Sequence, residues 1–427
     1  MKLNHIYKSI ACGVLLAMTA TSCDLDYNPV DTYSDVTEGV NKTDEKPIFN
    51  SVQDVETSMV TLHKKFRDQQ EHWYVDKLLI GDAHSDNAYA GTTGAEVVPY
   101  ETNSIEGSNS VLKRDWDRFL GDIAVANRII VGCDQLKALS ESERGKYQSQ
   151  AKIFRAMVMF DMVRLWGNFP VITTVGGDIT EDNVEEMYPT YFPPQNTAEE
   201  AYAQIEKDLT EAVENPNTPT NDTSDKSILT KSVARAMLAK VYAEKPLRDY
   251  AKVIKYADEL AADGFDLVED FSDLWAYDTE KKDCRVRNTK EAILEAHFPP
   301  GSGNWCTWMF GRNLSNWDES FTWAKWITPS RDLIRLYEEQ GDTKRYNESV
   351  VWYDCGWSNY YPADHYAFMY KCRSAFNSII YLRYADILLL KAEAKIMGEA
   401  PDLNGAADII DLSLIHISEP TRPISIS

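Results

Sequence analysis

A cluster of tryptophans between residues 305 and 326 is the part of this sequence best suited to bind a ligand. Five of the 11 tryptophans lie there, and neither a helical nor a strand period explains their spacing. Amide and guanidinium side chains are interleaved with them, including Asn304 and Arg312. Aromatic rings pack on the apolar faces of sugars, and polar groups bind sugar hydroxyls. The segment therefore predicts a sugar-binding loop, with about half of its rings expected in the core. The predicted ligand-facing residues are Trp305, Trp308, Asn313, Trp317 and Trp323.

A second group of candidate ligand-binding residues follows the first predicted helix and comprises Trp73, Asp86 and Asn87. Asp and Asn are equally common in turns and caps, so both interpretations stay open for Asp86 and Asn87. Turn chemistry is the preferred interpretation for Asp82. A third aromatic group is expected to serve helix packing or a surface that faces a partner. It consists of Trp352, Trp357, Tyr360 and Tyr361.

Enzyme chemistry has little support in the sequence. There is no G-x-S-x-G, no phosphate-binding loop and no H-E-x-x-H, and the histidines are scattered without metal-ligand spacing. Pairs of carboxylates such as Asp82 and Asp86 are expected by chance in so acidic a chain, so a glycoside hydrolase is the less favoured alternative. We predict no catalytic residue, no metal site and no cofactor, while a structural calcium ion in an acidic loop stays open.

The composition describes a folded and strongly acidic protein. The 427 residues are 44% hydrophobic and 11% aromatic, enough for a sizeable core. Lys and Arg number 44 and Asp and Glu 67, so the net charge is 44 − 67 = −23. A chain of this charge repels phosphate backbones, which argues against a nucleic-acid partner.

The first 22 residues are typical of a bacterial signal peptide. Lys2 and Lys8 precede a short apolar run, and Ala20-Thr21-Ser22-Cys23 resembles a lipobox, although Ala20 stands where Leu is usual. Cleavage before Cys23 and its acylation would anchor the chain by lipid; the alternative is an ordinary cleaved signal. The cysteines beyond Cys23 number five and contain no C-x-x-C, so we expect mostly buried thiols, with one Cys355–Cys372 bridge left open.

Amphipathic helices dominate the middle of the chain. Apolar residues recur at helical spacing in seven segments, and Ser51 and Gly167 are a plausible start and stop signal. Small residues at the contact positions suggest tetratricopeptide-like helix pairs that stack on one another. Long irregular segments lie between the helices, and residues 291–298 read as a short strand. The predicted fold is thus all-α dominated, with helical repeats, long loops and a few short strands. The seven helices are centred on residues 55–66, 116–130, 153–163, 202–212, 234–242, 250–261 and 384–392.

Six motifs in a fixed order make the chain similar to the SusD/RagB family of lipoproteins. The mature start Cys23-Asp-Leu-Asp-Tyr-Asn-Pro-Val-Asp31 and the helix Ala151 to Pro170, with Arg-Ala, Leu-Trp-Gly and Pro, resemble that family. The further matching segments, in family order, are 201–209, 234–242, 290–295 and 382–394.

This resemblance implies a surface-exposed outer-membrane lipoprotein of Bacteroidota. Such a protein binds a glycan and delivers it to a SusC-like TonB-dependent transporter without cleaving it; the alternative within the family is a RagB-like receptor for peptides or glycopeptides. The resemblance also implies that the region containing the tryptophan cluster, and the loop after the first helices, contribute to the ligand site.

Four regions are expected along the chain. They are a signal peptide over 1–22, a SusD-like N-terminal region over 23–244, an incomplete C-terminal region over 245–411 and a tail over 412–427. The tail resembles the translation of a sequencing-library adapter and is expected to be foreign. A helix beginning at Leu403 would then be cut short near Asp411, leaving the apolar face of the helix at 384–394 uncovered.

Overall fold

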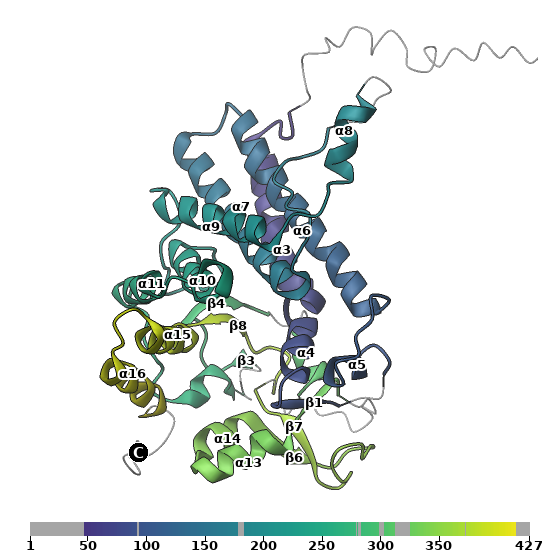
Figure 1. Cartoon of the computed structure of the whole chain (residues 1–427), viewed down its shortest axis with the longest axis vertical. Helices are drawn as coiled ribbons and strands as arrows, with labels where there is room; N and C mark the ends of the chain where they lie inside the picture. The colour runs from purple at the N-terminus through teal and green to yellow at the C-terminus, as the bar shows by residue number, and fades with distance from the viewer. Residues whose placement is uncertain are drawn as a thin grey trace, which may run out of the picture. The chain divides into compact units, whose positions relative to one another are not determined.

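All seven expected helices are present in the computed structural model, and the all-α dominated repeat fold is confirmed (Figure 1). The structure describes residues 47–91, 94–177, 183–278, 280, 283–298, 303–311, 325–371 and 373–415. The described part from Ile48 onward belongs to one unit. The seven helices are α3 (Val52–Asp68), α6 (Ser110–Gln135), α7 (Glu141–Trp166), α9 (Ala198–Glu214), α10 (Lys231–Ala243), α11 (Tyr250–Ala262) and α15 (Tyr384–Met397).

Local chemistry sets the ends of these helices. At the start of α3, the Ser51 hydroxyl accepts a hydrogen bond from the Asp54 amide, while the Asp54 carboxylate accepts one from the Ser51 amide. The expected apolar stripe, from Val55 to Phe66, is buried. Helix α7 ends at Gly167, whose φ of 71° lies in the region that glycine adopts most readily. Capping and periodicity together therefore explain why these segments are helical.

The helices stack in chain order, as repeat helices do. Each helix from α6 to α15 packs on the preceding one of the seven, and α15 packs in turn on α16 (Leu403–Ile415) (Figure 1). The expectation that the α15 face is uncovered is therefore wrong, because α16 lies against it. Helix α16 also continues four residues beyond Asp411.

A buried ion pair connects helices α7 and α9. The Arg155 guanidinium on α7 donates two hydrogen bonds to the Asp208 carboxylate on α9, at 2.8 and 2.7 Å. It donates a third to the Asn127 side-chain oxygen on α6, at 2.7 Å. Arg155 and Asp208 are 3% and 1% exposed. A bidentate pair of this kind fixes the relative register of the three helices.

The segments between the seven predicted helices contain further short elements, most of which the sequence does not predict. The helices among them are η2 (Glu71–Val75, a π-helical turn), α4 (Asp76–Ala83), α5 (Val98–Glu101), α8 (Val184–Tyr191), η3 (Lys245–Leu247), η4 (Phe271–Leu274), α12 (Cys306–Met309), α13 (Arg331–Gln340) and α14 (Thr343–Ser349). The strands are β1 (Ala88–Ala90), β2 (Tyr277–Asp278), β3 (Asp283–Cys284), β4 (Ala292–Ala296), β5 (Ile327–Pro329), β6 (Val350–Tyr353), β7 (Tyr366–Met369) and β8 (Ile379–Arg383).

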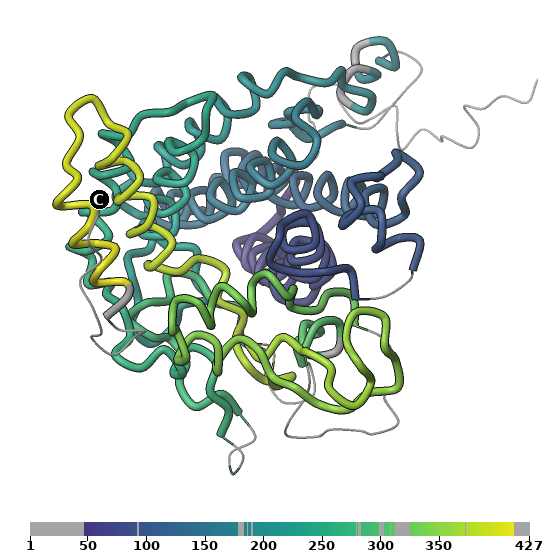
Figure 2. The backbone as a smooth tube through the Cα atoms, turned by 60° about the horizontal axis from the view of Figure 1, so that its bottom comes forward, coloured from purple at the N-terminus to yellow at the C-terminus, as the bar shows by residue number. Residues whose placement is uncertain are grey.

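The described strands form four antiparallel pairs, and two of these, β4 with β8 and β1 with β5, join distant parts of the chain. Strand β4, which the sequence predicts, pairs with β8, and all its residues are buried. Strand β1 pairs with β5 with Tyr89 opposite Thr328, which brings the region after α4 beside the segment that follows the tryptophan cluster. The remaining pairs are β2 with β3 and β6 with β7. Figure 2 shows residues 325–371 gathered beside the N-terminal helices.

The third aromatic group packs among β6, β7 and the short helices α13 and α14, so the expected helix packing is confirmed in part: Ile334 of α13 belongs to the same cluster, and Trp352 Nε1 donates to the Tyr346 hydroxyl of α14 at 2.8 Å. Tyr361, Tyr366 and Phe368 are buried in a second hydrophobic cluster around β6 and β7, and Trp357 packs against it. Trp352 stacks on His365 with ring centroids 4.2 Å apart. These rings therefore stabilise the hairpin.

None of the cysteines in the described ranges forms a disulfide, and three of them, Cys133, Cys284 and Cys306, are buried as expected. The bridge from Cys355 is absent: its thiol donates to the Trp357 carbonyl at 3.1 Å. Within the described ranges, no three His, Cys, Asp or Glu side chains are arranged to hold a metal ion. None of the helices in those ranges is long and apolar enough to cross a membrane.

Candidate functional site

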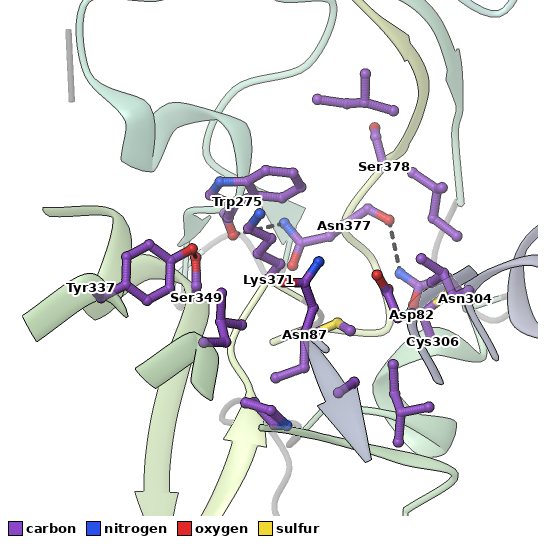
Figure 3. A pocket seen from close by; sticks show the side chains of 18 residues that line it. Asp82, Asn87, Trp275, Asn304, Cys306, Tyr337, Ser349, Lys371, Asn377 and Ser378 are labelled. Carbon is purple, nitrogen blue, oxygen red and sulfur yellow. Dashed lines mark hydrogen bonds between the residues drawn. The ribbon is translucent and has the colours of Figure 1, made fainter. Parts of the chain in front are cut away.

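A cavity of about 390 Å³ lies where the helical repeats meet the loop-rich segments (Figure 3). Its size is within the range of small-molecule sites. Residues of α4, β1, β5, α13 and β8 line it, together with the start of α12 and the turn after η4. The chain segments that form the cavity are therefore up to 300 residues apart and meet only in the folded protein.

Most of the cavity surface is apolar, and aliphatic side chains form a continuous part of its wall. The pairing of β1 with β5 places Ala88 and Pro329 side by side, and the alternation along β5 directs Ile327 to the same wall. Such a surface binds the apolar part of a ligand by excluding water. The other large apolar residues of the wall are Leu78, Leu333, Met369, Ile379 and Ile380.

Two buried polar atoms in the cavity wall have no hydrogen-bond partner among the described residues. They are the indole Nε1 of Trp275 and the side-chain oxygen Oδ1 of Asn377. Asn377 is 5% exposed, and its Nδ2 donates to the Trp275 carbonyl at 3.1 Å (Figure 3). A buried donor or acceptor without a partner costs about 1–3 kcal/mol. A ligand that supplies an acceptor to Trp275 and a donor to Asn377 would remove that cost.

The cavity holds one carboxyl and one ammonium group in its described lining. Burial raises the pKa of Asp82, and the positive charge of Lys371 partly opposes this effect. The Lys371 ammonium lies 5.1 Å from the centroid of the Trp275 ring, within range of a cation–π interaction. These groups offer directional hydrogen bonds to hydroxyls at one end of an otherwise apolar cavity.

Of the second predicted group, Asn87 alone belongs to the cavity wall. Asp86 is exposed and absent from the described lining, but its carbonyl accepts a hydrogen bond from the Ser330 hydroxyl. The Asn87 carbonyl accepts one from the Ser330 amide at 2.9 Å. Both hydrogen bonds use backbone carbonyls and a residue distant in the sequence, so the two interpretations of the Asp86 and Asn87 side chains stay open, with Asn87 in the cavity wall. Asp82, for which turn chemistry was preferred, lines the cavity as well.

The prediction that Trp73 contacts a ligand is wrong. Its side chain has 0% exposure and packs against Phe66, Phe119 and other core rings. Its Nε1 donates to the buried Asp122 carboxylate at 3.0 Å. Trp73 lies on the π-helical turn η2, where most side chains face the core. A ring with no exposed surface and a satisfied N–H cannot present either to a ligand.

The tryptophan cluster is only partly within the described residues. Trp305 is 39% exposed and stands between Asn304 and Cys306, which both line the cavity. Trp308 lies on α12. Asn313, Trp317 and Trp323, like Cys23, lie outside the described residues. Their predicted roles remain predictions.

Sequence reasoning missed the cavity residues Trp275, Lys371 and Asn377. None belongs to a motif or to an amphipathic stripe. Asn304 was noticeable as part of the tryptophan segment, and it holds this wall together: its Nδ2 donates to the carbonyls of Ser374 and Asn377 at 3.0 and 2.8 Å. Only the folded structure brings these side chains together.

Comparison with known proteins gives a family by sequence and a shared fold by structure. A SusD-like family model described as "Starch-binding associating with outer membrane" matches residues 32–243. A SusD-like protein of Bacteroides ovatus is 25% identical over 309 residues, which cover 69% of this chain and 50% of that protein. The chain thus aligns with about half the length of this curated relative.

Solved structures share the fold at low sequence identity. Surface glycan-binding protein A of Bacteroides fluxus has a TM-score of 0.69 at 20% identity, over 88% of this chain and 83% of that one. Its counterpart from Bacteroides thetaiotaomicron, solved with laminarihexaose, has a TM-score of 0.65 at 15% identity, over 86% and 83% of the two chains. A laminarin-binding SusD-like protein has a TM-score of 0.66 at 19% identity, over 88% of this chain and 87% of that one. With the family match and the common fold in agreement, the chain belongs to the SusD-like family.

Proposed function

We propose that this protein binds a glycan in the cavity described above and passes it, uncleaved, to a TonB-dependent transporter in the outer membrane. The observation that carries the proposal is the cavity itself, in which Trp275 Nε1 and Asn377 Oδ1 lack partners beside an apolar wall. A sugar unit has the matching chemistry, since each hydroxyl both donates and accepts and the ring carbons form an apolar face. The glycan-binding relatives with the same fold support this choice.

Binding without hydrolysis is supported by the charges of the site. Glycoside hydrolysis by the usual routes needs two carboxyl groups flanking the bond. The described lining contains one, Asp82. We propose that lipid on Cys23 anchors the protein to the outer membrane, where it meets the transporter; replacement of Cys23 by Ser should release it from the membrane fraction, and a tagged parent should co-purify with a transporter of this class.

The binding test is native gel electrophoresis of the protein in gels containing laminarin, starch, xylan or mannan. At least one polysaccharide should retard the parent, and Trp275→Phe, which replaces the indole by a smaller aromatic ring without an N–H, should weaken that retardation about fivefold. Trp357→Phe is the matched control, because its buried Nε1 also lacks a partner in the described structure but lies outside the cavity lining. Equal retardation of both variants and the parent would exclude this cavity as the site.

A peptide ligand is the second candidate, because the cavity surface is mainly apolar and suits an apolar side chain. Failure of every polysaccharide to retard the parent would favour it. Release of reducing ends from any of these polysaccharides would overturn the non-catalytic assignment.

A further inference from the structure

Gln70 connects the first helices to the segment that carries Trp305. It stands at the junction between α3 and the π-helical turn η2 and is 4% exposed. Its Nε2 donates to the Gly303 carbonyl at 3.2 Å, and its Oε1 accepts from the Trp305 amide at 2.7 Å. One side-chain amide therefore holds the backbone on both sides of Asn304. The two ends of these hydrogen bonds are more than 230 residues apart in the sequence.

The opposite side of the same segment is held by residues 374–377. The Asn304 amide donates to the Ala375 carbonyl at 2.6 Å. Gly303 fits closely here, since a Cβ at this position would lie 2.9 Å from the Ala375 carbonyl oxygen. Residues 303–305 are thus held between Gln70 and the strip of chain that supplies Asn377 to the cavity.

Gln70 lies between the end of α3 at Gln69, where φ and ψ are −88° and 66°, and the π-helical turn η2. A π-helical turn contains an extra residue, so side chains after it are displaced relative to those of a regular α-helix, and such turns are frequent at functional sites. Here Gln70, His72 and Trp73 are all buried, whereas Glu71 between them is partly exposed and pairs with Arg118. In an uninterrupted amphipathic α-helix, the buried side chains form a narrower stripe than these consecutive residues do.

We infer that Gln70 is a positioning residue for the ligand site, holding the Asn304–Cys306 wall and the exposed Trp305 in the geometry that binds ligand. This inference rests on the proposed function. Gln70 does not line the described cavity, so its effect on binding passes through the backbone that it fixes. The hydrogen bonds supply an acceptor and a donor that no aliphatic side chain replaces.

The test compares Gln70→Leu, Gln70→Glu and the neighbouring control Gln69→Ala, each in the full chain. Hydrogen–deuterium exchange read by mass spectrometry on peptides containing Trp305 reports the backbone directly. Retardation by laminarin and the other three polysaccharides reports binding. Gln70→Leu should speed exchange of the Trp305 amide at least tenfold and weaken retardation about tenfold. Gln70→Glu retains the acceptor for Trp305, so its amide should stay protected and its retardation should be intermediate. Gln69→Ala should match the parent in both.

Two results would overturn the inference: parent-like exchange at Trp305 in Gln70→Leu, or faster exchange there without weaker retardation. If Gln70→Leu fails to fold, Gln70→Glu decides, because loss of its Gly303 hydrogen bond must still weaken retardation. A purely structural role would accelerate exchange throughout α3 and α6 as well. If no polysaccharide retards the parent, the proposed function fails, and unchanged Trp305 exchange in Gln70→Leu would separately refute the positioning.

Discussion

Replacing Asp115 by Asn should stabilise this protein at neutral and alkaline pH. Asp115 on α6 and Asp76 on α4 are 1% and 0% exposed, and Oδ1 of each carboxyl group has no hydrogen-bond partner in the described structure. Burial and the charge of Asp76 favour a proton on Asp115, which that group can share with Asp76. The Arg114 guanidinium pairs with Asp76 and lies 3.7 Å from Asp115.

The magnitude follows from the pKa of Asp115. Burial first, and then the charge of Asp76, raise that pKa from 3.8 to about 9, while Arg114 partly opposes the shift. Below pH 4 the group is protonated in the folded and unfolded chain, and it affects stability little. Between about pH 4 and pH 9 the unfolded chain releases a proton that the folded chain keeps, so the free energy of unfolding falls by at most about 1.4 kcal/mol per pH unit. Relaxation and water penetration reduce this, and we expect a cost on the order of 2 kcal/mol at pH 8.

Asparagine removes this cost because its amide donates to Asp76 at every pH. Urea unfolding followed by far-ultraviolet circular dichroism at pH 4.5, 6, 7 and 8 measures the difference between variant and parent. Asp117→Asn is the control, since Asp117 lies on the same helix with a side chain 59% exposed. The gain for Asp115→Asn should grow steadily with pH, and that for the control should not. A difference that is independent of pH, or a variant less stable than the parent at pH 8, would refute the shared proton.

Two further predictions concern buried polar groups. Arg155→Met leaves the Asp208 carboxylate buried without its charged partner and should lower the free energy of unfolding by about 3–5 kcal/mol. The double variant Arg155→Met/Asp208→Leu should recover part of this loss. An equal loss of stability in the single and double variants would argue against a stabilising ion pair. Trp73→Phe removes one hydrogen-bond donor from the Asp122 carboxylate and should lower the free energy of unfolding, measured in urea, by about 1–3 kcal/mol. Polysaccharide retardation should stay unchanged. Weaker retardation at parental stability would show that Trp73 belongs to the ligand site.

The helices were predictable because their information is local. The stripe on α3 and its Ser51 cap, and the Gly167 stop of α7, act within a few residues of chain. The strand β4 was predictable for a similar reason, as a short apolar run. Trp73 was misassigned because an extra residue in a π-helical turn changes which side chains face the core, and no pattern in residues 69–75 announces it.

The sequence by itself determined the helical repeats, their caps and the family, since repeated periodicity and ordered motifs are properties of one strand of chain. Only the tertiary structure decided where the cavity lies and which side chains enter it. Asp82, Trp275 and Asn377 come from three distant segments and meet through strand pairing and helix packing. Each such contact depends on hydrogen bonds and packing between residues that are distant in the sequence, and a local sequence pattern does not specify these.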